Sequence, residues 1–255
     1  MLFRSLGIDE AMAQVEAAAH AALVEAKLGE GDLARIHAGI GLAGMGRKGA
    51  REALLARPHR FARIAFASDG LVACLGAHGG ADGGIVICGT GSIGLALVNG
   101  QEVRVGGYGF PISDEGSGAD LGLQAIRLAL RARDGRTEYS PLLRAVLARF
   151  DDDPFAAVAW MDRATATEYA TFAPLVMRHA DQGDPMGRRI VQGAAEQIDA
   201  LVRALIERGA ARVTLLGGLS SAIEPWLAPD VRRRLAPVQA DAVSGALYLA
   251  RQATK

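Results

Sequence analysis

The chain has 255 residues, half of them apolar and 5% aromatic, and its formal net charge at pH 7 is zero. Balanced charge argues against a nucleic-acid partner, which usually requires a basic face, and no apolar run is long enough to span a membrane. The two cysteines, Cys74 and Cys88, are too few for a disulfide framework and lack metal-ligand spacing. We therefore expect a cytoplasmic protein of one large or two modest domains, with neither a nucleic-acid nor a membrane partner.

The first elements alternate between helix and strand. Residues Leu6–Lys27 are rich in alanine and predict a helix, which Gly29 can end. A strand is expected at Ile36–Leu42, followed by a glycine turn that contains Gly44 and leads into a helix at Arg47–Leu55.

Asp69 follows the next predicted strand, Phe61–Ala67, and precedes a helix that starts at Leu71. An aspartate at the carboxyl end of a strand lies where α/β folds place active sites. Aspartate at this position is also a favoured helix N-cap, for purely structural reasons. The pattern alone favours the cap.

A glycine loop separates two further predicted strands. The run Ile85–Cys88 has the apolar character of a buried strand, and Ile93–Val98 predicts a second one that meets a hairpin turn at Asn99-Gly100. Between the two strands lies Gly89-Thr90-Gly91-Ser92. Because glycines allow a ligand close to backbone N–H groups and the two hydroxyls add donors, this loop is a candidate phosphate site.

An acidic glycine turn, Asp114-Glu115-Gly116-Ser117-Gly118, precedes a predicted helix at Gly118–Arg133. Either Asp114 or Ser117 could cap that helix, so a purely structural role for Asp114 has to be considered. Upstream of the turn, Tyr108 is expected to be a packing residue.

The remainder is mostly helical from Phe155 to Arg208. A strand is predicted at Arg212–Leu216, and Gly217-Gly218-Leu219 then leads into another helix. An alanine- and glycine-rich closing helix falls within Pro237–Ala250.

Four of these motifs together resemble the BadF/BadG/BcrA/BcrD ATPase family, a branch of the actin/hexokinase/Hsp70 superfamily. The motifs are Cys88–Ser92, Gly107–Gly109, Asp114–Gly118 and Leu216–Ser220. The resemblance implies an α/β fold of two lobes, the actin-like ATPase (ribonuclease H-like) fold. We expect lobes at residues 1–110 and 111–255, the second ending in the closing helix.

The resemblance also implies an ATP-dependent kinase that phosphorylates the 6-hydroxyl of glucosamine or N-acetylglucosamine, with ATP and Mg²⁺ as cofactors. Ile93 stands where some N-acetylglucosamine kinases carry an asparagine that contacts the sugar, which favours free glucosamine. Whether the chain forms a homodimer stays open, and no metal-ligating residue is assigned. The implied site consists of Asp69 as general base, Gly89, Thr90, Gly91 and Ser92 as phosphate loop, Asp114, Glu115 and Gly44 as sugar contacts, and Gly217, Gly218 and Leu219 as the adenosine seat.

One family element is missing from the sequence. Related kinases begin with a strand and an Asp-Gly-Gly-Gly-Thr turn, so we expect an N-terminally shortened chain whose first lobe lacks its initial strands. Two alternatives follow. The protein could be an iron–sulfur activator ATPase of a dehydratase, or it could bind nucleotide or sugar without catalysis.

Overall fold

The computed structural model of the protein describes residues 7–45 and 49–252. The predicted helix starts at Leu6 and Arg47 lie outside the described residues. By its internal contacts the described chain divides into two compact units. The first unit comprises the described residues of Met1–Gly83, Leu95–Glu102 and Pro237–Lys255, and the second comprises Gly84–Gly94 and Val103–Ala236. The predicted lobe boundary at residue 110 stays a prediction.

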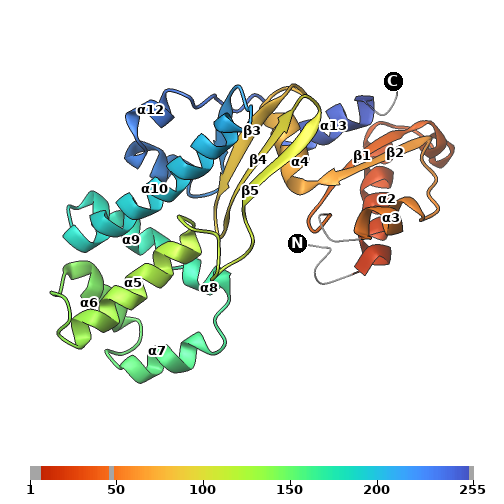
Figure 1. Ribbon diagram of the computed structural model, residues 1–255. Helices are drawn as coiled ribbons and strands as arrows, with labels where there is room; N and C mark the ends of the chain where they lie inside the picture. The colour runs from red at the N-terminus through yellow and green to blue at the C-terminus, as the bar shows by residue number, and fades with distance from the viewer. Residues whose placement is uncertain (1–6, 46–48, 253–255) are drawn as a thin grey trace. The chain divides into compact units, whose positions relative to one another are not determined.

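The first unit contains a two-stranded parallel sheet with helices packed on it (Figure 1). In the register of this sheet Leu42 lies opposite Ser68, so the two strands end at the same edge. Met12, Ile40 and Phe66 belong to the buried apolar cluster between helix and sheet. The elements are α2 Gly7–Glu25, the 3₁₀ helix η1 Glu30–Arg35, β1 His37–Leu42, α3 Ala50–Leu55, β2 Arg63–Ser68, α4 Asp69–Ala77 and α13 Ala242–Gln252.

The closing helix α13 packs against α4 and β1 with almost no space between the backbones. A β-carbon at Gly245 would lie 1.8 Å from the carbonyl oxygen of Val72, and one at Gly39 would lie 1.9 Å from that of Ala246. Only glycine fits such an approach. The predicted closing helix is confirmed, although it begins at Ala242 rather than near Pro237.

The second unit holds the strands that flank the glycine loop and most of the helices of the described chain. Three strands, β3 Gly83–Cys88, β4 Ser92–Val98 and β5 Gln101–Gly106, have residues in both units, with Gly83, 95–98 and 101–102 assigned to the first. The other elements of the second unit are α5 Gly118–Arg133, α6 Pro141–Ala148, α7 Pro154–Met161, α8 Ala166–Ala170, α9 Ala173–Asp181, α10 Pro185–Glu207, β6 Val213–Leu216, α11 Ser220–Ile223, η2 Glu224–Trp226 and α12 Pro229–Arg232.

These strands form one sheet in the order β5-β4-β3-β6. Strand β3 pairs in parallel with β6, with Ile87 opposite Leu216, so the loops that follow both strands leave the sheet at the same edge. Strands β4 and β5 are joined by the predicted turn, in which Asn99 and Gly100 both have positive φ values, 50° and 75°. This combination is typical of a type I′ hairpin turn, so the hairpin prediction is confirmed.

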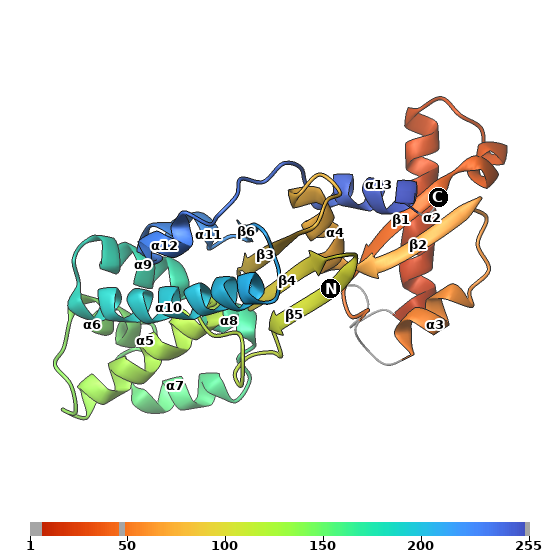
Figure 2. The same cartoon turned by 45° about the horizontal axis from the view of Figure 1, so that its top comes forward.

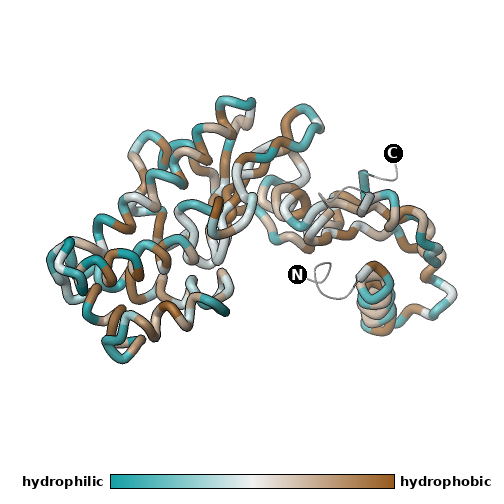
Figure 3. The backbone as a smooth tube through the Cα atoms, turned by 60° about the horizontal axis from the view of Figure 1, so that its bottom comes forward, coloured by the Kyte–Doolittle hydropathy of each residue, from teal (hydrophilic) through white to brown (hydrophobic). Residues whose placement is uncertain are grey.

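Helices α5 and α10 lie side by side in the second unit (Figure 2). Hydrophobic and hydrophilic residues alternate along the helical segments, as Figure 3 shows, and the apolar ones provide the core between the helices. Asp184 caps α10. Its carboxylate accepts hydrogen bonds from the N–H groups of Met186 and Gly187 at 2.9 and 3.0 Å, and also from that of Leu142 at 2.8 Å. One buried carboxylate thus ties the start of α10 to the start of α6.

No helix in the described part of the chain combines the length and apolar character needed to cross a membrane.

Candidate functional site

The glycine loop directly follows β3, as predicted, and its two hydroxyls have different surroundings. Thr90 is exposed, whereas Ser92 is buried and its hydroxyl donates to the carbonyl oxygen of Glu115 at 2.7 Å. The Gly89 N–H donates within the loop, to the carbonyl oxygen of Gly91 at 2.9 Å. The Thr90 hydroxyl is therefore the exposed hydroxyl of this loop, and the Ser92 hydroxyl attaches the loop to the acidic turn.

Helix α5 begins directly on the glycine loop. The N–H groups of Gly118 and Ala119, at the start of the helix, donate to the carbonyl oxygens of Gly89 and Thr90 at 2.7 and 3.2 Å. Two of the otherwise unpaired donors of a helix start are satisfied in this way. These two hydrogen bonds attach the carbonyl groups of Gly89 and Thr90 to the start of α5.

Asp114 lies against the same loop. A β-carbon at Gly91 would be 2.6 Å from Asp114 Oδ2, while Asp114 Oδ1 accepts the N–H of Gly109 at 3.3 Å. Burial raises the pKa of Asp114, and the N–H donors of Gly109 and Phe110 oppose this rise in part. The residue has a φ of 67°, a left-handed conformation that is uncommon outside glycine. Such backbone outliers are frequent at functional sites.

The capping interpretation of Asp114 is wrong. Helix α5 is capped by Ser117, whose hydroxyl accepts the N–H of Asp120 at 3.2 Å. Glu115 is exposed, and its carboxylate accepts the hydroxyl of Ser113 at 3.3 Å. The carboxylate of Asp114 is thus left free of any role in the helix.

The Gly217–Leu219 segment meets the end of β3 from the other side. Gly217 has a φ of 98°, and a β-carbon there would lie 2.3 Å from the carbonyl oxygen of Cys88. The same oxygen accepts the N–H of Leu219 at 3.0 Å. Gly217 and Gly218 are exposed and the Leu219 side chain is buried, so this segment presents backbone to the solvent. Three predicted motifs therefore surround the carboxyl end of one strand, β3.

Asp69 and Gly44 lie in the first unit, at the shared edge where β1 and β2 end. The capping interpretation of Asp69 is wrong, because Ser68 caps α4 by accepting the N–H of Leu71 at 3.0 Å. Asp69 is exposed, and its Oδ1 accepts the N–H of Gly70 at 2.9 Å. Its other carboxylate oxygen faces no donor that the structure describes. Gly44, with a φ of 90°, forms the turn after β1.

Tyr108 lies on the surface, contrary to the expectation from the sequence. Its expected packing role is wrong, because the residue is 74% exposed. The Arg104 guanidinium lies over the Tyr108 ring, 5.3 Å from the ring centroid. The backbone N–H of Tyr108 donates to the Ser113 hydroxyl at 3.3 Å. The glycines on both sides, Gly107 and Gly109, have positive φ values of 69° and 105°. Those flanking glycines were the available signal that this tyrosine sits on a sharply bent loop beside Asp114.

The two cysteines do not form a ligand set. Both are buried, and burial raises the pKa of the Cys88 thiol to about 12, so it stays protonated at neutral pH. Its Sγ donates to the carbonyl oxygen of Gly116 at 3.6 Å. Across the described ranges no three His, Cys, Asp or Glu side chains are grouped as metal ligands would be. A cluster-binding thiolate, which the iron–sulfur alternative requires, has no support in these surroundings.

These features define an α/β protein of the actin-like ATPase fold, with a glycine loop at the carboxyl end of β3. Residues 2–250 match the BadF/BadG/BcrA/BcrD ATPase family, and the chain belongs to that family.

Relatives and solved structures agree with this assignment. The chain is 39% identical to the glucosamine kinase GspK of Vibrio cholerae over 96% of its own length and 83% of that protein. It is 32% identical, over 57% of its length and 49% of the relative, to an N-acetylmuramic acid/N-acetylglucosamine kinase of Clostridium acetobutylicum. A solved structure of a proposed N-acetylglucosamine kinase from Chromobacterium violaceum superimposes with a TM-score of 0.83 at 40% identity, covering 96% of this chain and 86% of that one. The predicted fold class is confirmed.

Proposed function

We propose that this chain is an aminosugar kinase that transfers the γ-phosphoryl group of ATP to the 6-hydroxyl of glucosamine or N-acetylglucosamine. The observation that carries the proposal is the contact between Gly91 and Asp114, which joins a phosphate-type loop to a partly buried carboxylate. The names of the relatives from Vibrio cholerae and Clostridium acetobutylicum support the same substrate class. Free glucosamine is the expected substrate, because Ile93 replaces the asparagine of some N-acetylglucosamine kinases.

In this mechanism Asp114 holds the sugar. A carboxylate in a partly buried position accepts a hydroxyl or an ammonium group, and a substrate that lacks that group leaves the charge unpaired. Glu115 and Gly44 are the further sugar contacts in the proposal. Because the pKa of Asp114 is raised, aminosugar binding should weaken at low pH, since the protonated acid no longer attracts an ammonium group.

The loop Gly89–Ser92 is proposed to bind the transferred phosphoryl group. Its exposed contributions are the Thr90 hydroxyl and the backbone of Thr90 and Gly91. Donors held in advance at the transferred group offset the charge of the transition state without reorganisation. The adenosine part of ATP is assigned to the exposed backbone of Gly217 and Gly218 and to Leu219.

Asp69 is proposed as the general base that accepts the proton of the attacking hydroxyl. Its exposed carboxylate, with one oxygen lacking a described donor, is consistent with this role. The proposal requires that Asp69 come within hydrogen-bond reach of the sugar bound at Asp114 during turnover. It also takes the lobes to be residues 1–110 and 111–255.

The described residues fit a Mg²⁺ ion that is bound together with the phosphates of ATP. Mg²⁺ is commonly held by one or two carboxylates together with substrate phosphates and water. Asp69 is an exposed carboxylate that could take part, and no preformed cluster of acidic ligands is found among the residues that the structure describes. When bound with ATP, the ion would neutralise charge on the phosphates.

The proposal is tested by measuring ADP release with ATP, Mg²⁺ and a panel of glucosamine, N-acetylglucosamine, glucose and mannose. Turnover that depends on an aminosugar supports it. Binding of ATP and glucosamine by calorimetry without turnover would instead favour the non-catalytic alternative.

A further inference from the structure

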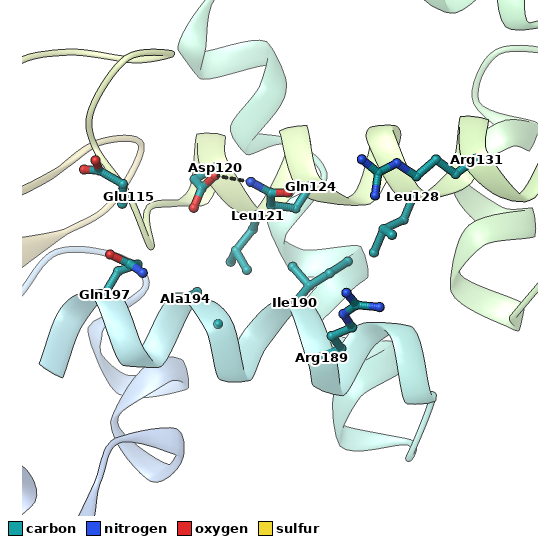
Figure 4. A pocket seen from close by; sticks show the side chains of 11 residues that line it. Glu115, Asp120, Leu121, Gln124, Leu128, Arg131, Arg189, Ile190, Ala194 and Gln197 are labelled. Carbon is teal, nitrogen blue, oxygen red and sulfur yellow. Dashed lines mark hydrogen bonds between the residues drawn. The ribbon is translucent and has the colours of Figure 1, made fainter. Parts of the chain in front are cut away.

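A pocket of about 360 Å³ lies between α5 and α10 within the second unit (Figure 4). Its volume falls in the range of roughly 300–1,000 Å³ that is typical of small-molecule sites. It begins beside Glu115 and extends along the two helices, away from the glycine loop. None of the catalytic or nucleotide-binding roles proposed above uses the far part of this pocket.

Two arginines mark its far end. Arg131 comes from the last turn of α5 and Arg189 from the first turns of α10, and both side chains border the same part of the pocket (Figure 4). Neither guanidinium forms an ion pair with a described carboxylate, whereas Arg203 pairs with Asp230 at 2.7 Å. Two guanidinium groups without a counter-charge at one end of a pocket suit a dianion, since each can donate two parallel hydrogen bonds.

The rest of the pocket suits a neutral, hydroxylated body. Leu128 and Ile190 line its middle. Two amides, Gln124 and Gln197, and two carboxylates, Glu115 and Asp120, line the end opposite the arginines (Figure 4). The Gln124 amide nitrogen donates to Asp120 Oδ1 at 3.0 Å, which leaves its carbonyl oxygen as an acceptor. An apolar floor with a few amide groups is a common arrangement for the ring and hydroxyls of a sugar.

The pocket is also attached to the acidic turn. Asp120 Oδ2 accepts the N–H of Gly116 at 2.9 Å, and a β-carbon at Gly116 would lie 2.6 Å from the carbonyl oxygen of Ala194 on α10. The turn that carries Asp114 therefore rests on the same two helices that form the pocket walls.

We infer that this pocket binds a hexose phosphate, with the phosphoryl group between Arg131 and Arg189 and the sugar hydroxyls at Gln124 and Gln197. The phosphate end of this site lies away from Glu115, the proposed sugar contact that borders its near end, and the inference does not depend on the chain being a kinase. A ligand there would bridge α5 and α10 and stabilise the folded state by mass action.

The test is calorimetric titration and thermal unfolding with glucose 6-phosphate, without ATP and at constant ionic strength, with glucose and inorganic phosphate as companion probes. The variant Arg131→Gln/Arg189→Gln removes both charges. The control Arg127→Gln/Arg133→Gln removes the same charge from exposed positions of α5 that do not line the pocket. Asp114→Asn reports on binding at the acidic turn. We expect at least ~10-fold weaker binding of glucose 6-phosphate in the Arg131/Arg189 variant, and unchanged binding in the control and in Asp114→Asn.

Several outcomes would overturn the inference. Undiminished binding in the Arg131/Arg189 variant would exclude the arginine pair as the phosphate site. Loss of binding in Asp114→Asn would locate the ligand at the acidic turn instead. Equal affinity for inorganic phosphate and glucose 6-phosphate would show that Gln124 and Gln197 do not contribute to binding of the sugar. These results come from binding alone, so they stand whether or not the aminosugar kinase activity is found.

Discussion

The carboxylate of Asp114 rests on the α-carbon of Gly91, so closely that a β-carbon at residue 91 would be 2.6 Å from Asp114 Oδ2. The proposed phosphate loop and the proposed sugar contact are thus one packed unit, and neither can shift without the other.

Gly91→Ala should therefore impair sugar binding although residue 91 is assigned to the phosphate. The added methyl displaces the Asp114 carboxylate, and a misplacement of about 1 Å can cost on the order of 100-fold in rate. We expect kcat/KM for glucosamine to fall by roughly 10- to 100-fold. Steady-state kinetics with each substrate varied in turn measures this. Gly31→Ala is the matched control, since nothing lies within 4 Å of a β-carbon there; equal kinetics of Gly91→Ala and the control would contradict the contact.

Asp69→Asn should remove the base while leaving the fold intact, because the residue is exposed and Ser68, not Asp69, caps α4. General-base catalysis contributes about 10²- to 10⁴-fold, so kcat should fall by that order. Asp181→Asn, another exposed aspartate, serves as the control. An Asp69→Asn enzyme with unchanged kcat and unchanged melting temperature would show that another group accepts the proton.

The pH dependence of sugar binding should follow Asp114. Its pKa is raised, chiefly by burial, so the carboxylate becomes protonated as pH falls at a higher pH than an exposed aspartate, which titrates near about 3.9. The KM for glucosamine should accordingly rise as pH falls, beginning at a higher pH than an exposed aspartate would give, while the KM for ATP changes less. In Asp114→Asn this rise should disappear. Persistence of the same acid limb in Asp114→Asn would assign it to a different group.

How far the sequence could predict this site is clearest at the two helix starts. In each, serine and aspartate lie close together and either can cap, and only the backbone conformation decides that Ser68 and Ser117 take the role. The glycine loop, the hairpin and the start of α5 followed from local signals. The exposure of Tyr108 and the contact of Gly217 with Cys88 did not, because both depend on how distant segments meet.

Gly217→Ala should weaken nucleotide binding. The new β-carbon would lie 2.3 Å from the carbonyl oxygen of Cys88, and the φ of 98° is unfavourable for alanine. Relief of this clash should move Leu219 and the start of α11, raising the KM for ATP at least ~10-fold. The neighbouring Gly218→Ala has open space around its β-carbon and is the matched comparison. Similar KM values for ATP in both variants would argue against the assigned adenosine seat.

Asp184 should contribute to stability in a pH-dependent manner. Burial alone would raise its pKa, but the N–H groups of Leu142, Gly187 and Met186 and the Ser140 hydroxyl hold it below the ordinary value. Asp184→Ala should lower the free energy of unfolding by roughly 2–3 kcal/mol at neutral pH, since it leaves donors unpaired.

The sign of this pH effect follows from the lowered pKa. The stabilisation is fully present above the unfolded-state pKa and is lost as pH falls through the lower folded-state pKa. Denaturant unfolding of both proteins at pH 7 and pH 3 should therefore show the difference shrinking at acid pH. The His179 Nδ1 atom lies 3.9 Å from a carboxylate oxygen of Asp184. The proteins with aspartate and with alanine at position 184 are therefore compared again in a His179→Gln background. If the difference in unfolding free energy between the two proteins did not depend on pH in either background, the lowered pKa of Asp184 would be contradicted.

The most direct measurement is ³¹P NMR of the protein incubated with ATP, Mg²⁺ and glucosamine, alongside Asp69→Asn and Asp114→Asn. The account predicts ADP and a new phosphomonoester signal at the sugar 6-position with the wild-type chain, and a strongly reduced signal with either variant. ATP hydrolysis to inorganic phosphate without a sugar phosphate, or a sugar phosphate formed equally well by both variants, would contradict it.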